Sequence, residues 1–239
     1  MTRRLLLGVA ALACVLPSAA AAAAAPSKEL ASILAAARTQ VSVHYTSDTN
    51  FGAGQLSFVG DAGLVDGSQV ITFRKSGKTG HVTVIVSGET AYIRGDAFTL
   101  ANYIGFKAAA ASDYAGRWVR FPHTDAGYPT LAAGVTLPSV VGEIGVAGQL
   151  SSVPTTKIAA QQVFGIKGVD SSSSGPTTVD TVYARAAGSP LPVEETAKHG
   201  TIRLTINFSG WNESIAIAAP KGSVAISVVR KDKGTGFVD

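Results

Sequence analysis

Histidines, acidic side chains and one cysteine are the residues of this 239-residue chain that could support catalysis or bind a metal ion. The four histidines are scattered along the sequence: His44, His81, His123 and His199. No two of them have the spacing expected of ligands to one metal ion. Glu194 and Glu195 are the only adjacent carboxylates, and neighbouring side chains on a strand point to opposite faces. They are therefore not expected to act together as a catalytic pair.

Strong catalytic and nucleotide-binding motifs are absent from the sequence. It contains no HExxH, GxSxG, SxxK, P-loop or GxGxxG pattern. Hydrophobic residues make up 46% of the chain and charged residues only 15%, so placed titratable groups are few and a sizeable core can form. We expect a protein without catalytic residues, bound metal or cofactor.

The charge pattern argues against nucleic acid as a partner. The formal net charge is +4, and a leader that contains Arg3 and Arg4 would remove two of these charges. The longest basic cluster is Arg230–Lys233, which is interrupted by Asp232. A nucleic-acid-binding domain normally carries a larger basic patch. We interpret this cluster as a solvated tail, flexible from about residue 230.

The first 25 residues have the three parts of a secretory signal peptide. A short cationic start is followed by an apolar run over residues 5–16, and residues 18–25 are small and offer several A-x-A cleavage sites. The apolar run is too short to cross the ~30 Å hydrocarbon core as a helix. We expect cleavage between Ala19 and Ala25 and export of the mature chain to the periplasm, the cell envelope or the medium.

Cys14 is the only cysteine, which excludes an intramolecular disulfide and a cysteine-based zinc site. The sequence around it, residues 11–14, resembles a degenerate bacterial lipobox, in which Cys14 would become a lipidated N-terminus and anchor the protein to a membrane. Cleavage in the later alanine run would remove Cys14 instead. We favour the second route and keep lipidation of Cys14 as the alternative.

Hydrophobic periodicity predicts a helix followed by many strands. Residues 28–39 have apolar side chains at helical spacing, whereas residues 41–45, 56–58, 71–73, 82–86 and 91–93 alternate with a period of two. Short Gly-rich segments separate these strands, which indicates an antiparallel meander.

The middle of the chain changes character, and strands then resume. Helix-like segments are predicted at residues 97–104, 106–114 and 138–150. The later predicted strands are residues 156–169, 177–186, 191–196, 201–208 and 214–219. The predicted fold class is α+β: a strongly curved antiparallel half-barrel of about ten strands, with helices covering its concave face, in a single domain over residues 26–239.

The order of several segments resembles the LolA-like bacterial lipoprotein-carrier superfamily, and in particular its actinobacterial LppX/LprG-type lipoproteins. Residues 41–46 look like the family's first strand, residues 91–96 like the strand that leads into its helical insert, and residues 114–119 like the exit from that insert. Residues 188–193 and 208–213, with Ala219–Pro220 after them, resemble its late hairpins and its end. The likeness extends over about residues 28–225.

The resemblance implies an exported envelope protein that binds a lipid or an acylated molecule in an apolar half-barrel cavity and carries it. The Gly- and Ala-rich segments 106–116 and 135–148 would then serve as a lid. The chain would be a monomer that meets other envelope proteins as partners. The alternative is a structural or partner-binding envelope protein with a filled core and no ligand, because strand periodicity does not reveal a cavity.

Shared parity within the alternating strands predicts which apolar side chains line the concave face. They are Val43, Leu56, Phe58, Ile71, Phe73, Val84, Val86, Ile202, Leu204, Ile206, Ile215 and Ile217. A charged residue in place of Phe73 or Ile206 is expected to abolish ligand binding while costing less stability than a change in a packed core.

Overall fold

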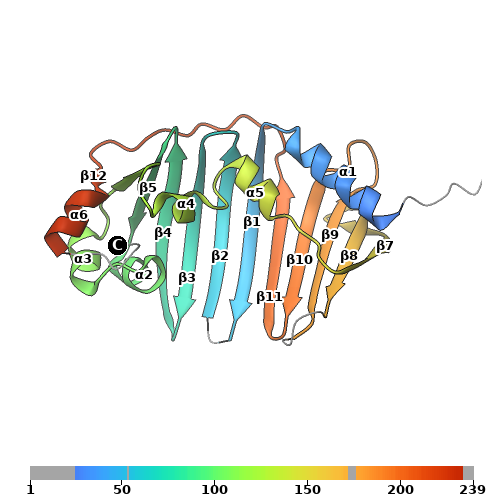
Figure 1. Ribbon diagram of the computed structural model, residues 1–239, viewed down its shortest axis with the longest axis horizontal. Helices are drawn as coiled ribbons and strands as arrows, with labels where there is room; N and C mark the ends of the chain where they lie inside the picture. The colour runs from blue at the N-terminus through green and yellow to red at the C-terminus, as the bar shows by residue number, and fades with distance from the viewer. Residues whose placement is uncertain (1–24, 53, 172–175, 234–239) are drawn as a thin grey trace, which may run out of the picture.

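The computed structural model describes residues 25–52, 54–171 and 176–233. Within these ranges the chain forms one twelve-stranded sheet and a set of short helices, which confirms the predicted α+β class (Figure 1). The predicted leader, its cleavage sites and Cys14 lie outside the described residues, as do the last six residues.

A meander forms one half of the sheet, as the alternating pattern predicted. Its five consecutive antiparallel strands are β1 (Ser42–Phe51), β2 (Gly54–Gly63), β3 (Gly67–Lys75), β4 (Lys78–Ser87) and β5 (Thr90–Gly95). The short strand β6 (Val119–Pro122) continues this half antiparallel to β5, and β12 (Val224–Ala225) adds a parallel edge beside β6.

The other half consists of late strands that return to the middle of the sheet. They are β7 (Gln149–Ile158), β8 (Gln161–Asp170), β9 (Thr178–Arg185), β10 (Pro192–His199) and β11 (Ile202–Ser209). Strand β11 pairs with β1, so strands far apart in sequence meet at the centre of the sheet. The sheet does not close, and its outer strands are β12 and β7.

Two late segments differ from the prediction. Residues 156–169 are not one strand but parts of β7 and β8, joined by a tight turn at Ala159 and Ala160, whose φ angles are +47° and +65°. Alanine rarely adopts this conformation, so the sequence carried no turn signal. Residues 214–219 are not in a strand, because the chain there runs as an irregular segment from β11 towards β12.

Short helices lie over one face of the sheet (Figure 1). They are α1 (Pro26–Arg38), α2 (Ala97–Thr99), the π-helix η1 (Leu100–Ile104), α3 (Ala108–Tyr114), α4 (Tyr128–Ala132), α5 (Leu137–Glu143) and, at the β12 edge, α6 (Ile226–Lys233). The helix expected over residues 138–150 ends at Glu143, where glycines follow. None of the helices in the described ranges has the length and apolar character needed to cross a membrane.

Helix α6 corrects the interpretation of the basic cluster near the end. Arg230 is in this helix, and its Nη1 lies 2.5 Å from Oδ2 of Asp125, with side chains only 25% and 10% exposed. This bidentate contact holds the pKa of the Asp125 carboxyl below its usual range, although burial acts against it. Residue 230 is therefore part of the folded body and not the start of a solvated tail.

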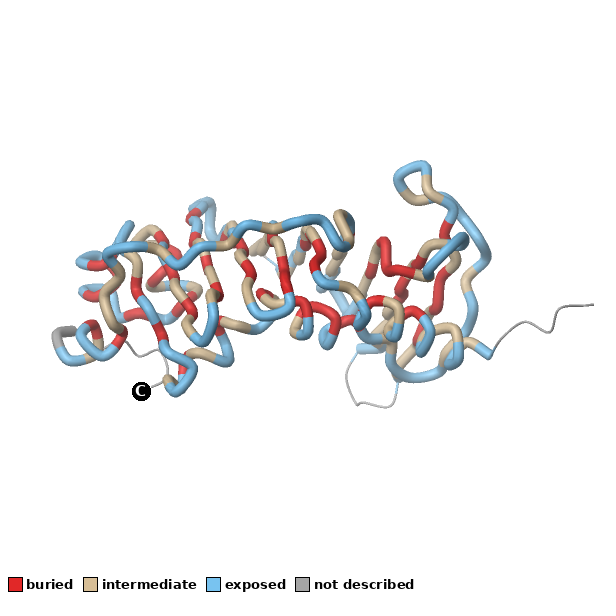
Figure 2. Tube along the Cα trace, turned by 90° about the horizontal axis from the view of Figure 1, so that it is seen from above, coloured by how far each residue is buried: buried red, intermediate tan, exposed pale blue. Residues whose placement is uncertain are grey.

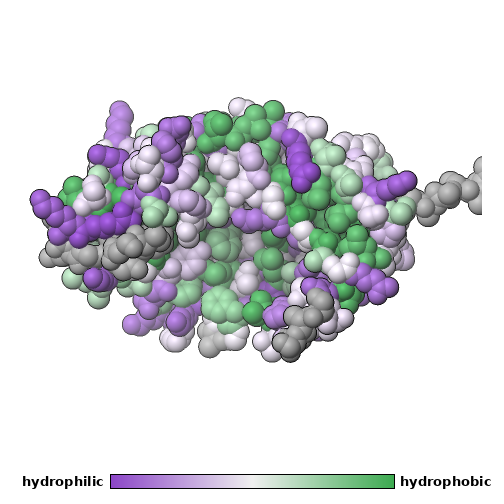
Figure 3. Space-filling model, in the orientation of Figure 1, coloured by the Kyte–Doolittle hydropathy of each residue, from purple (hydrophilic) through white to green (hydrophobic). Residues whose placement is uncertain are grey.

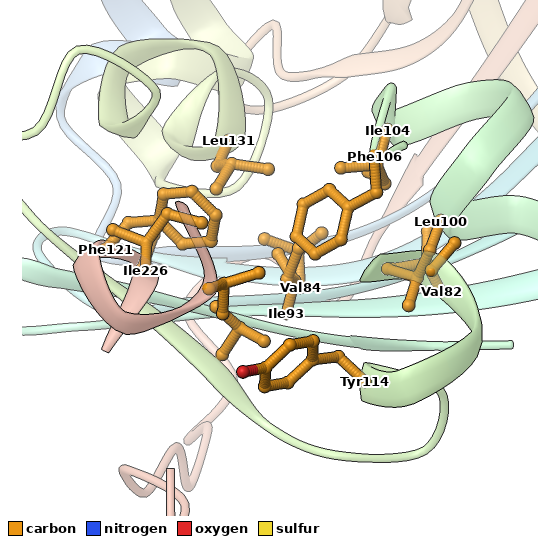
Figure 4. Packing of buried hydrophobic residues seen from close by; sticks show 14 of the residues in the cluster. Val82, Val84, Ile93, Leu100, Ile104, Phe106, Tyr114, Phe121, Leu131 and Ile226 are labelled. Atoms are coloured by element: carbon orange, nitrogen blue, oxygen red, sulfur yellow. The ribbon is translucent and has the colours of Figure 1, made fainter. Parts of the chain in front are cut away.

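Buried side chains form two clusters on the covered face. Figure 2 shows buried residues in both halves of the molecule. In the first, strands β4–β6 meet η1, α3, α4 and α6, with Ile93 and Phe121 completely buried (Figure 4). In the second, α1 and α5 pack on β1 and on β8–β10 around Ile33 and Ile166. The middle of the sheet, between these clusters, is covered less completely.

Candidate ligand cavity

A cavity of about 450 Å³ lies between the sheet and the helices at this middle position. Its lining comes from strands β1–β4 and β11 on one side, and from η1, α4, α5 and the α4–α5 loop on the other. The space-filling view shows hydrophobic residues at the back of the hollow below α4 and α5 (Figure 3). The lining residues are Tyr45, Ser47, Thr49, Phe58, Gln69, Ile71, Val84, Tyr103, Ile104, Thr130, Leu131, Ala133, Gly134, Val140, Glu143, Leu204, Ile206 and Phe208.

Strand register explains why these side chains share one face. Ile206 lies opposite Ser47, Ser47 opposite Phe58, and Phe58 opposite Ile71. Directly opposed residues on antiparallel strands point to the same face, so this row crosses four strands as a continuous floor. Exposure along β11 rises from Phe208, which is buried, to Ile202, which is 40% exposed, so the floor opens towards the start of β11.

Tyr45 connects the floor of the cavity to its cover, which is formed by η1, α4, α5 and the α4–α5 loop. Its hydroxyl donates to the backbone oxygen of Gly134 at 2.5 Å and accepts from Nε2 of Gln69 at 2.7 Å. The ring lies across β2 at Gly60, where a Cβ atom would stand 2.5 Å from the ring, so only glycine fits. Burial raises the pKa of the Tyr45 phenol above its ordinary value of 10.0, which keeps the hydroxyl protonated as a donor.

The α4–α5 loop sits directly on the sheet at one point. A Cβ atom on Gly67 would overlap the backbone oxygen of Val135, so the loop and strand β3 are in backbone contact. Gly134 adopts a φ of +69°, a conformation suited to glycine, and its N–H donates to Oγ of Ser139 at 2.7 Å. The cover is therefore fixed close to the sheet at the end of the cavity where Tyr45 lies.

Polar groups on the cover mark the side of the cavity that meets solvent. Thr130 and Glu143 are both exposed and both line the cavity. Burial raises the pKa of the Glu143 carboxyl, and a hydrogen bond with Ser139 opposes this shift. A Cβ atom on Gly134 would stand 3.6 Å from Oε2 of Glu143 and 3.7 Å from Nε2 of Gln69, so these two groups face the same point.

Residues 144–148, between α5 and β7, form a strap that crosses strands β8–β10. The N–H of Gly145 donates to Oε1 of Glu195 at 3.2 Å, and the N–H of Ala147 donates to the carboxylate of Asp180. Burial, together with the nearby charges of Asp180 and Glu143, raises the pKa of Glu195 to about 7, although the hydrogen bond from Gly145 acts against this shift. Glu195 is thus a buried group that holds the strap through its hydrogen bond from Gly145.

The structure brings five of the twelve predicted lining residues into the cavity wall: Phe58, Ile71, Val84, Leu204 and Ile206. Four others lie on the same face but in packed regions: Val43, Leu56, Phe73 and Val86. Phe73 stacks on Phe98 with ring centroids 5.7 Å apart and contacts Tyr103 at 5.6 Å. Ile202 has the predicted parity but lies at the exposed end of β11.

Ile215 and Ile217 have a different location, which corrects their predicted placement. They line a separate pocket of about 260 Å³ on the opposite face of the sheet, beside His44 and Asp61, whose Nδ1 and Oδ1 atoms are 2.8 Å apart. His44 and Asp61 alternate with the residues that face the cavity, so they point away from it. The prediction failed because residues 214–219 form no strand, so the alternation of apolar residues there does not assign side chains to a face of the sheet.

Polar lining residues were not among the predicted set. Tyr45, Ser47 and Thr49 continue the parity of Val43 on β1, so the alternation itself could have identified them. Gln69 continues the parity of Ile71 on β3 in the same way. Glu143 carried no such signal, because it lies at the end of a helix. Among the described residues there is no group of three His, Cys, Asp or Glu side chains placed to hold a metal ion.

Comparison with known proteins identifies the fold. No family model and no curated protein sequence matches the chain. Among solved structures, LprF from Mycobacterium bovis aligns over 82% of this chain and 97% of its own, with a TM-score of 0.54 and 14% identity. The lipoprotein LppX from Mycobacterium tuberculosis aligns over 81% and 98%, with a TM-score of 0.51 and 14% identity.

The chain has the LppX fold. This confirms the predicted resemblance to LppX/LprG-type proteins, and with it a large curved antiparallel sheet covered by helices on one face. At 14% identity the likeness shows the fold alone.

Proposed function

We propose that this protein binds a lipid or an acylated molecule in the cavity between its sheet and its helices, and that it carries this ligand in the bacterial cell envelope. The observation that supports the proposal is an apolar floor that the helices do not fill, next to two clusters that they do fill. Burial of apolar surface contributes about 25 cal/mol per Å², so an acyl chain gains affinity from such a floor without catalytic groups.

The alternative of a filled structural core is disfavoured by the volume of the cavity. Its 450 Å³ lies within the ~300–1,000 Å³ typical of small-molecule sites. The likeness to LppX, whose name describes it as a lipoprotein, supports an envelope location. We further propose export by the N-terminal leader with loss of Cys14; intact mass of the secreted protein would show a diacylglycerol-modified Cys14 if the lipidated route is used.

Native mass spectrometry of the purified mature protein, followed by organic extraction, is the direct test. A bound lipid in the extract is the expected result. Displacement of a fluorescent acyl probe from the wild type and from Ile206→Glu then locates the site. Ile206 lines the cavity, so the variant should lose binding because its charge would face the acyl chain without a partner.

Phe73→Glu is not the equivalent test that the sequence suggested. Phe73 is 4% exposed and packs against two aromatic rings, so a charge there should disrupt the fold. Val59→Glu is the matched control, because Val59 is 49% exposed and alternates with Phe58 to the other face. Absence of any extractable or displaceable ligand in the wild type would favour the structural alternative.

A further inference from the structure

The charges around the cavity are one-sided. Glu143 is the single charged side chain among the described lining residues, and no lysine, arginine or histidine is among them. Apart from Glu143, the polar atoms of the lining belong to hydroxyls, one amide and the backbone. An anionic group inside the cavity would find no cation to pair with.

Glu143 is placed to meet the polar end of a ligand. It is the last residue of α5, it is exposed, and it lines the cavity, so its carboxylate lies where the cavity meets solvent. Gln69 and the hydroxyl of Thr130 line the same cavity. An apolar floor below and a hydrogen-bond acceptor at the rim together fit an amphiphile with its chain inside and its headgroup at Glu143.

We propose that Glu143 makes the cavity select ligands by headgroup charge, accepting headgroups that donate hydrogen bonds without a negative charge and rejecting anionic ones. This inference rests on the proposed lipid-binding function. A hydroxyl or an ammonium can donate to the Glu143 carboxylate, and a hydrogen bond to a charged acceptor is stronger than one between neutral groups. A carboxylate or phosphate would instead be repelled by a like charge with no compensating cation.

Chain-matched probes test the inference directly. Monododecanoylglycerol, dodecylamine and dodecanoate carry the same length of chain with neutral, positive and negative headgroups. Each is added below its micellar concentration at pH 8 to displace a fluorescent uncharged lipid from the whole mature protein. We expect the glycerol ester and the amine to compete, and dodecanoate to bind at least about tenfold more weakly.

Glu143→Gln keeps the size and removes the charge of this side chain. We expect dodecanoate to bind to it nearly as well as the glycerol ester, and dodecylamine to lose about tenfold in affinity. The matched control is Glu89→Gln, which makes the same charge change in the β4–β5 turn, where the Glu89 side chain is 81% exposed beside His123. The control should reproduce the wild-type order of affinities.

The outcomes separate this inference from the function on which it rests. Equal binding of all three probes to the wild type would overturn charge selection and leave lipid binding in place. An unchanged preference in Glu143→Gln would also overturn it, because the selection would then have another source. If the fluorescent lipid itself fails to bind, both proposals fall together.

Discussion

Two regions of the same sheet have the same alternating sequence pattern but differ in how completely their inward side chains are buried. On β4–β6, the inward side chains of Ile93 and Phe121 are 0% exposed under η1, α3, α4 and α6 (Figure 4). On β11, the inward side chains of Leu204 and Ile206 are only partly buried and face the cavity. Period-two patterning therefore specifies a face, and the helices above that face decide whether it becomes core or binding wall.

Truncation of one residue in each region should give the largest difference. Phe121→Ala removes a ring enclosed on all sides and should lower the free energy of unfolding by about 3–5 kcal/mol. Ile206→Ala should cost about 1 kcal/mol or less, because its side chain already borders open space and has fewer contacts to lose. Urea unfolding of ligand-free protein measures both, and equal losses would mean that the middle region is packed in solution.

The strap over β8–β10 should make stability depend on pH. Glu195 has a pKa raised from 4.5 to about 7 in the folded protein, mainly by burial. Between pH 4.5 and about 7, the folded state therefore keeps a proton on Glu195 that the unfolded state has released. Stability should be greatest below about pH 4.5 on this account and should fall by about 2–3 kcal/mol as the pH rises from about 4.5 to about 7.

Asp180 and Glu143 act in the same direction, since burial raises the pKa of each carboxyl. Glu195→Gln should unfold with a much flatter dependence on pH between 5 and 8 than the wild type. Thermal melts across this range provide the measurement. A wild-type curve that rises with pH over the same interval would contradict the assignment.

Loss of the tie between floor and cover should change stability less than Phe121→Ala or the titration of Glu195, and it should change the dynamics clearly. Tyr45→Phe removes the hydroxyl that donates to Gly134 and accepts from Gln69, at a cost of about 1–2 kcal/mol. Amide hydrogen exchange should accelerate in the α4–α5 loop, while the filled cluster around Phe121 should keep wild-type protection. Uniform acceleration through the molecule would show that the two regions are not independent.

Much of the architecture was readable from the sequence because local rules govern it. The opening helix, strands β1–β5, the strand at residues 201–208 and the helical segments after residue 97 follow from apolar spacing and from Gly-rich connections. The parity of Phe58, Ile71 and Ile206 was also correct, since a period of two assigns each side chain to a face.

The cavity itself was decided only by tertiary structure. The cover lies close to the sheet because Gly67 leaves room for the backbone of Val135 and Gly60 leaves room for the ring of Tyr45. These contacts join segments up to about 70 residues apart in the sequence. Alternation cannot report such contacts, nor could it show that Phe73 is packed by Phe98 or that Ile215 lies on the other face. The sequence by itself determined which side chains share a face of the sheet, because strand periodicity is local. Tertiary packing alone decided which of them are enclosed and which face open space, because that depends on how closely distant segments approach.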